Sequence, residues 1–213
     1  MLFSLIFPPK CTLCRNLLSQ EETDLCHSCR IHAPQVYKTK RKIPFIAQWT
    51  AIWYYKDDVR KSIQRYKFSN ARSYADTYAR LLAAKILDAE LLEKIDVVTW
   101  APVSAARHFK RGYDQSELLA KSLCKELSCT PVKLLKKARH TKAQSSIQDP
   151  SQRRANIMNA YRCINPDMVA DKRILLIDDV LTTGSTASEC AKTLLTHGAK
   201  EVFLATIAVA AKD

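Results

Sequence analysis

A strand–turn–helix–strand unit over residues 174–209 limits the possible folds of this chain more than any other segment. Ile174 to Ile177 form a continuous apolar run, which is typical of a central parallel strand buried on both faces. After a polar turn, apolar side chains recur at helical spacing from Ala187 to Leu195. Gly198 ends this helix, and Val202 to Val209 form the next strand. This order predicts an α/β fold with a parallel sheet and helices on its faces.

The preceding segments extend the same pattern. Aromatic and apolar residues predict strands over 48–55, 96–100 and 131–135. Apolar positions at helical spacing predict helices that begin at Asp57, cover residues 74–86 and run from about Gly112 to Leu127. Residues 138–156 are polar and basic without a dominant period, which predicts a long loop with a short helix. With 213 residues, 47% of them hydrophobic, the chain can bury one sizeable core.

The polar turn after the apolar run is the strongest candidate site. Ligands of open parallel sheets bind beyond the carboxyl ends of the strands, where this sequence has Asp178 and Asp179. Gly184 lets the backbone curl, so that amides and hydroxyls can converge on one anion at a helix N-terminus. The carboxylates should instead face hydroxyl donors or a cation. The turn therefore predicts a site for a phosphorylated sugar with Mg²⁺, with hydroxyls from Thr182, Thr183, Ser185 and Thr186. The alternative is an ordinary capped helix, in which these hydroxyls only satisfy its first amides.

Four of the eight cysteines form a second pattern, two Cys-x-x-Cys turns at Cys11, Cys14, Cys26 and Cys29. Two such turns can complete a tetrahedral thiolate site, so the spacing predicts a structural zinc ion. The alternatives are a pair of disulfides or a redox dithiol, but no βαβ pattern surrounds either turn. His27 and His32 could replace a cysteine ligand, although solvated histidines fit the pattern better. The other four cysteines are interpreted as small hydrophobic residues, because Cys190 falls on the apolar face of a predicted helix and free cysteines are usually buried.

Charge and composition suggest three parts: a zinc-finger segment over 1–33, a basic linker over 34–47 and the main domain over 48–213. The net charge is +13, and residues 30–72 contain eleven basic side chains against Asp57 and Asp58. Such a field should attract phosphates, either on a small metabolite or on nucleic acid. No apolar run approaches the roughly 20 residues that span a bilayer, and residues 2–7 lack a preceding basic region. We therefore expect a cytoplasmic protein without a transmembrane segment.

The motifs, taken in order, resemble a known family. The segment RILLIDDVLTTGST is similar to the phosphoribosyl-pyrophosphate (PRPP) motif of type I phosphoribosyltransferases. The N-terminal SLIFPPKCTLC and the blocks DDVRKSIQRYKF, APVSAARHFKRGYDQSELLAK and RHTKAQSSI resemble the competence-associated ComF and GntX family. The resemblance covers nearly the whole chain. It implies a type I phosphoribosyltransferase fold with a small N-terminal zinc-binding segment.

The resemblance also implies roles for the matching residues. Asp178 and Asp179 would hold the ribose hydroxyls of PRPP as the catalytic residues, and the 5′-phosphate would lie on Thr182, Thr183, Gly184, Ser185 and Thr186. The pyrophosphate would lie against Pro102, Val103 and Ser104, with charge neutralised by Arg107, Lys110 and Arg111. Each of these basic residues could instead be a solvated helix flank. The family's flexible loop, which closes over the substrate, matches Arg139, Thr141 and Gln144.

Three positions depart from the family pattern. Asp114 stands where asparagine is usual, so a neutral donor is replaced by a possible anion. Thr182 stands where purine-salvage enzymes have an aspartate base, which argues against purine salvage. Arg15 follows Cys14 where glycine is common, which could alter the turn without removing a zinc ligand.

Two functions fit the sequence. The first is a phosphoribosyltransferase that uses PRPP and Mg²⁺ with an unknown acceptor. The second is a non-catalytic module for DNA uptake, in which PRPP acts as an effector while single-stranded DNA or competence proteins bind elsewhere. The second reading draws on the basic charge and on possible stacking surfaces at Trp49, Trp53, Tyr54 and Tyr55. Aromatic residues on a strand are, however, more often part of a core.

Overall fold

The computed structural model describes residues 8–37, 41–138 and 159–211, and within them four parallel strands form the main sheet. Their order is β1–β6–β5–β2, so β5 and β6 are the inner strands. The bounds are Gln48–Tyr54 for β1, Val97–Trp100 for β2, Arg173–Leu181 for β5 and Glu201–Val209 for β6. The parallel sheet expected from the C-terminal unit is confirmed.

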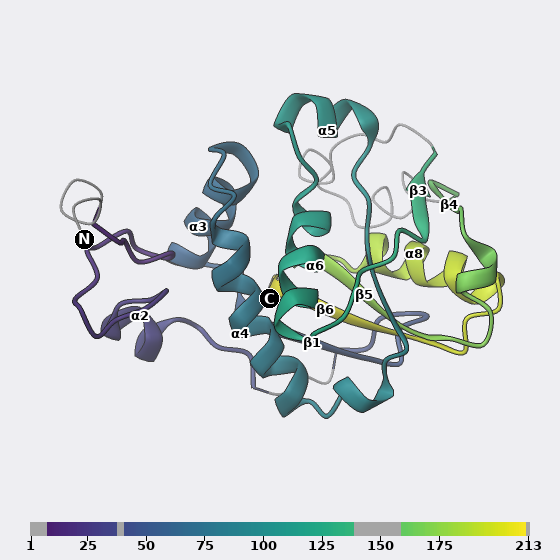
Figure 1. The fold of residues 1–213 in the computed structure, drawn as a ribbon, viewed down its shortest axis with the longest axis horizontal. Coiled ribbons are helices and arrows are strands. Elements are labelled where there is room, and N and C mark those ends of the chain that lie inside the picture. Colours follow the sequence, from purple (N-terminus) through teal and green to yellow (C-terminus); the bar gives the residue numbers. More distant parts are fainter. Residues whose placement is uncertain (1–7, 38–40, 139–158, 212–213) are drawn as a thin grey trace.

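Helices cover both faces of this sheet (Figure 1). One face carries α3 (Asp57–Phe68), α4 (Tyr74–Asp88) and α6 (Gln115–Glu126), and the other carries α8 (Ser185–Thr196). The side chains of β5 alternate between the two cores. Leu175 and Ile177 pack with the α3, α4 and α6 side chains, whereas Ile174 and Leu176 pack with those of α8. Both faces of the strand are therefore buried, which explains its continuous apolar run.

Short elements complete the described fold. The helix α5 (Ala105–Arg111) follows β2, and β3 (Leu135–Lys137) pairs antiparallel with β4 (Tyr161–Cys163). Single 3₁₀ turns lie at η1 (Leu92–Lys94) and η3 (Pro166–Met168), and α2 (His27–His32) lies in the N-terminal segment.

The structure differs from the expected boundaries in three places. β5 continues through the acidic pair to Leu181, because its pairing with β6 continues as far as Val209. Gly112 ends α5 with a left-handed φ of 74° instead of opening the next helix, which starts at Gln115. The strand expected over 131–135 begins only at Leu135, because the amide of Val132 bonds to Val98 outside any regular ladder. Most of the loop expected over 138–156 lies outside the described residues.

The N-terminal segment packs directly on the α3 and α4 side of the main domain. Leu13 and Leu25 belong to the same buried cluster as the residues of these helices. The hydroxyl of Ser62 donates to the carbonyl of Thr12 at 2.5 Å, and Asp24 forms an ion pair with Arg80. The cysteine segment therefore shares its core with the main domain.

The described part of the expected linker is also packed. The amide of Val36 bonds to Ile52 at 3.0 Å, and the amide of Tyr54 bonds to Pro34 at 2.7 Å, so residues 34–36 run along β1. Ile43 is buried in the core on the α8 face. These contacts hold residues 34–36 and Ile43 against the sheet.

Candidate functional site

The two adjacent acids lie in the second half of β5 and have different partners. The Oδ1 of Asp178 accepts from the hydroxyl of Ser116 at 3.1 Å and from the amide of Asp179 at 2.8 Å. The carboxylate of Asp179 instead pairs with the Nζ of Lys67 on α3 at 2.7 Å, and both side chains are largely buried. One acid is therefore neutralised by a cation, while the other relies on neutral donors.

This difference affects the ionisation of Asp178. Burial, reinforced by the neighbouring charge of Asp179, raises the pKa of the Asp178 carboxyl to about 7. The backbone amide, Lys67 and Ser116 oppose this rise without cancelling it. The proton on Asp178 is thus poised to leave near neutral pH, which is typical of a functional site.

The turn after β5 has the shape of an anion-binding loop. Gly184 adopts φ 86°, a left-handed conformation that glycine reaches without strain. A Cβ at this position would lie 3.3 Å from the Cγ2 of Ile43. The hydroxyls of Thr183 and Ser185 bond to each other at 2.8 Å, and the amide of Ser185 donates to Thr183 at 3.3 Å. The loop then enters the N-terminus of α8, where a helix favours anions.

A pocket of about 440 Å³ opens over the carboxyl end of the sheet and is lined by eight of the predicted site residues. It is lined by Pro102, Val103, Arg107, Arg111, Asp178, Asp179, Thr182 and Thr186. Gly184 lines a smaller adjoining cavity with Asp178 and Thr182. Two separate chain segments, one after β2 and one at the end of β5, thus converge on one space, as parallel strand ends should.

Other predicted residues have different positions. Ser104 caps α5, where its hydroxyl accepts from the amide of Arg107 at 3.4 Å. Lys110 is exposed and is not among the residues that line the pocket. The predicted flexible-loop residues Arg139, Thr141 and Gln144 lie outside the described residues.

Sequence reasoning missed one wall of the pocket. Arg60, Gln64, Lys67 and Phe68 on α3 all line it, at helical spacing that places them on one face. The block DDVRKSIQRYKF resembles a family motif, but nothing in the sequence shows that Lys67 forms an ion pair with Asp179, 112 residues away. Arg111 of α5 lies 4.8 Å above the ring of Phe68, so the two helices meet across the pocket mouth.

Lys137 and Tyr161 form a second unexpected contribution, from the paired strands β3 and β4. Both line the pocket, and the Nζ of Lys137 lies 3.4 Å from the Tyr161 hydroxyl. Burial and the neighbouring charge of Arg107 lower the pKa of Lys137, and burial raises the pKa of Tyr161. With Arg60, Lys67, Arg107 and Arg111, the pocket wall has five cationic side chains against two acids.

Asp114, the residue that departs from the family's asparagine, is buried and joins two parts of the site. Its Oδ1 accepts from the amides of Ser116 and Glu117, which caps α6, and its Oδ2 accepts from the amide of Val103 at 2.9 Å. An aspartate offers acceptors on both oxygens, whereas an asparagine would turn its NH₂ toward one of these amides. Asp114 therefore holds the 102–104 loop to the start of α6.

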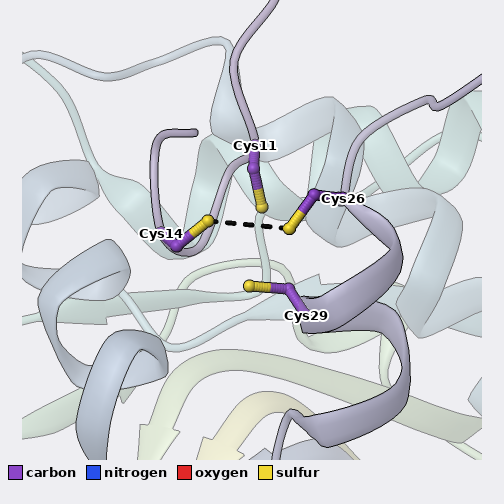
Figure 2. Close-up of side chains that lie close together, drawn as sticks. All are labelled: Cys11, Cys14, Cys26 and Cys29. Carbon is purple, nitrogen blue, oxygen red and sulfur yellow. Dashed lines mark hydrogen bonds between the residues drawn. The ribbon is translucent and has the colours of Figure 1, made fainter. Parts of the chain in front are cut away.

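The four N-terminal cysteines come together (Figure 2). Their sulfur atoms lie within 4.8 Å of one another, and the Cys14 and Cys26 sulfurs are 3.6 Å apart. Zinc with sulfur ligands at about 2.3 Å needs sulfurs about 3.8 Å apart in a tetrahedron, so the cluster fits such an ion. All four thiols are free, and 3.6 Å is far beyond a disulfide bond. The cluster could hold a metal ion such as zinc.

The backbone at Arg15 shows why glycine is common at this position. Arg15 adopts φ 71°, the left-handed conformation for which glycine is the usual residue. Arg15 therefore strains the turn, and Cys14 still lies in the cysteine cluster. His27 and His32 are exposed and are not part of the cysteine cluster.

Comparison with known proteins agrees with the phosphoribosyltransferase fold and the family resemblance of the sequence. A phosphoribosyl transferase domain model matches residues 114–213. The chain is 30% identical to the DNA utilization protein YhgH of Escherichia coli K12 over 200 residues, covering 90% of this chain and 86% of that protein. It is 27% identical to Competence protein F of Haemophilus influenzae over 215 residues, covering 91% of this chain and 93% of that protein.

A third relative is Competence protein ComFC of Streptococcus pneumoniae, 29% identical over 190 residues, covering 89% of this chain and 77% of that protein. No helix among the described residues is both long and apolar enough to cross a membrane. The fold is a phosphoribosyltransferase fold, with a parallel sheet flanked by helices and a cysteine cluster near the N-terminus. With these relatives aligned along most of its length, the chain belongs to the ComF family.

Proposed function

We propose that the pocket binds PRPP with Mg²⁺ and that the protein transfers the phosphoribosyl group to an acceptor. The observation that carries this proposal is the convergence of three features on one pocket: the acid pair of β5, Thr182 and Thr186 from the loop after it, and the cationic wall. Ribose hydroxyls need acceptors, a terminal phosphate needs a cradle of amides and hydroxyls, and pyrophosphate needs cations. The pocket offers all three kinds of group.

The ligand has one natural orientation in this pocket. The 5′-phosphate would lie at the N-terminus of α8, on the 182–186 loop, and the ribose hydroxyls would face Asp178 and Asp179. The pyrophosphate would then lie toward Pro102 and Val103, beside Arg107 and Arg111. Asp114 supports this end, because it holds the Val103 amide in place.

The carboxylates of Asp178 and Asp179 are the oxygen donors that Mg²⁺ prefers. Among the described residues, only the cysteine cluster gathers three or more potential protein ligands, so Mg²⁺ would rely largely on oxygens of the substrate. That division is usual for magnesium in phosphate-transfer sites. Bound there, the ion would neutralise part of the charge on the leaving pyrophosphate.

The chain's own contribution to the transfer is positioning and charge. The bond from ribose C1 to pyrophosphate breaks, its electron pair leaves with the pyrophosphate, and a bond forms from the acceptor to C1. Arg107, Arg111 and Lys137 stand where they would stabilise the charge that accumulates on the leaving group. No side chain needs to act as a nucleophile.

The α3 wall is the side from which the acceptor would approach. Displacement at a sugar carbon brings the nucleophile to the face opposite the leaving group. Arg60 and Gln64 on α3 line the same pocket and would contact the acceptor there.

A second function is a PRPP-responsive module for DNA uptake. Relatives named competence and DNA utilization proteins, together with the net charge of +13, favour it. Fewer aromatic side chains than expected are available to stack on DNA bases. Trp53 is only 2% exposed, and the indole of Trp49 donates to the carbonyl of Arg41 at 2.8 Å. In this reading the same pocket binds PRPP but releases no pyrophosphate.

Thermal stability and product formation separate these readings. PRPP with Mg²⁺ at about 100 times its dissociation constant should stabilise the wild type by about 2.7 kcal/mol. The D178N/D179N double variant should lose most of this shift, while the control D167N, an exposed acid outside the pocket, should keep it. An equal shift in the double variant would contradict the ribose contacts. Steady pyrophosphate release with candidate acceptors supports catalysis, and binding without release supports the effector reading.

A further inference from the structure

A side chain from outside the phosphoribosyltransferase motif contacts the back of the 182–186 loop. The Nη2 of Arg41 donates to the carbonyl oxygen of Thr182, and its Nη1 lies 3.4 Å from the carbonyl oxygen of Ala210. Its own carbonyl accepts from the indole of Trp49 at 2.8 Å. Arg41 therefore joins the basic segment before β1 to the loop after β5 and to the end of β6.

The bond to Thr182 affects the direction of the next amide. In a trans peptide the carbonyl oxygen and the following N–H point in opposite directions. Because Arg41 holds the Thr182 oxygen on its own side, the N–H of Thr183 is directed away from Arg41. A guanidinium on the carbonyl also polarises the peptide, which strengthens the N–H as a donor to an anion.

A neighbouring contact fixes the same loop through packing. Ile43 is 5% exposed and belongs to the same buried cluster as Leu181. Its Cγ2 would lie 3.3 Å from a Cβ at Gly184, so it closes the space behind this glycine. Two residues of one short segment thus touch the loop, one by hydrogen bonding and one by packing.

We propose that Arg41 is a positioning residue for the phosphate-binding loop and couples the basic segment at 41–43 to the ligand. The inference rests on the proposed function, because it takes the 182–186 loop as the phosphate subsite. Coupling is reciprocal: a phosphate on the loop tightens the segment, and a partner that displaces the segment weakens phosphate binding.

The test compares two ligands across matched variants, by calorimetry. Ribose 5-phosphate needs the loop, whereas inorganic pyrophosphate should lie at the 102–104 side. R41Q should weaken ribose 5-phosphate about tenfold and leave pyrophosphate within about twofold, because a hydrogen bond to a charged group is lost. K42Q removes the same charge from the adjacent exposed residue and should bind both ligands as the wild type does.

R41K separates positioning from charge, because a lysine keeps the charge but not the planar fork that reaches two carbonyls. It should be impaired, although less than R41Q. Wild-type affinity in either R41Q or R41K overturns the proposal, as does equal weakening of pyrophosphate. Hydrogen exchange gives a second readout: ribose 5-phosphate should slow exchange over 41–47 in the wild type and not in R41Q. If the wild type itself fails to bind ribose 5-phosphate, the proposed function fails and this inference falls with it.

Discussion

At the scale of single residues, the most informative pair is Asp178 and Asp179. The carboxyl of Asp178 has its pKa raised to about 7, chiefly by burial and then by the charge of Asp179. Its surroundings also include Lys67 from α3 and Lys137 from β3. The ionised carboxylate accepts hydrogen bonds from ribose hydroxyls on both oxygens, whereas protonation turns one oxygen into a donor, so protonation should oppose binding.

PRPP affinity should therefore rise as the pH increases through about 7, from the pKa of Asp178. Titrations from about pH 6 to about pH 8 would measure this rise, and the phosphates of PRPP also titrate near the lower limit. D178N supplies the control, because it retains the ligand's own titration and lacks the carboxyl. A wild-type profile that matches D178N in shape would contradict the role of this proton. The free energy of unfolding should instead fall as the pH rises from about 4 to about 7, because over this range the folded state holds a proton on Asp178 that the unfolded chain has already lost.

Lys67 is the residue whose role the sequence concealed. Its ion pair with Asp179 spans α3 and β5, with side chains 18% and 13% exposed. K67M should lower the free energy of unfolding by about 1–3 kcal/mol, because it leaves a largely buried carboxylate without its cation. The double variant K67M/D179N should be more stable than the sum of the single changes predicts, by about 1 kcal/mol. Strictly additive effects in urea unfolding would show that the pair contributes no coupling.

At the scale of elements, the N-terminal segment depends on its cysteine cluster. We expect a zinc ion held by Cys11, Cys14, Cys26 and Cys29, because the segment buries few apolar residues of its own. C26S should lose the metal in elemental analysis and speed hydrogen exchange over 8–33 more than over β5 and β6. C129S, which changes an exposed cysteine outside the cluster, should retain the metal. A metal-free wild type with four titratable thiols would contradict the site.

The elements also show what the sequence could and could not predict. The apolar run at 174–177 predicted a central strand correctly, because burial on both faces leaves a local signature. The continuation through Asp178 to Leu181 has no such signature, because it depends on pairing with β6. The prediction that a helix begins near Gly112 is wrong, because the left-handed φ with which this residue ends α5 cannot be read from the sequence. The acid pair and the 182–186 loop were predictable as one contiguous motif, whereas Lys67, Lys137 and Arg41 reach the site only through tertiary packing.

At the scale of the whole molecule, the net charge of +13 gives a field that attracts polyanions. If single-stranded DNA binds, the logarithm of its affinity should fall with the logarithm of salt concentration, by roughly 0.7 for each phosphate neutralised. Fluorescence anisotropy at several salt concentrations would measure this slope. K56Q/K61Q, which removes two exposed charges outside the pocket, should flatten it without changing the PRPP shift. A slope unchanged in this variant would exclude the outer face of α3 from the contact.

Saturating PRPP adds a second comparison to the same assay. DNA that enters the pocket should be displaced by PRPP, whereas DNA on a separate surface should remain bound. The outcome therefore distinguishes a shared site from two sites on one molecule. No binding at low salt would contradict direct contact with DNA.

The strand order also has a consequence for how the protein is made. Among the described strands, β6 is the last to be synthesised, yet it lies between β1 and β5. A growing chain that has already released β1 must keep this strand without its neighbour until residues 201–209 emerge. Its apolar side chains, including Trp53, stay open to wrong partners throughout that interval. The nascent protein therefore completes its ligand site and buries β1 in the same late step, when β6 inserts between β1 and β5.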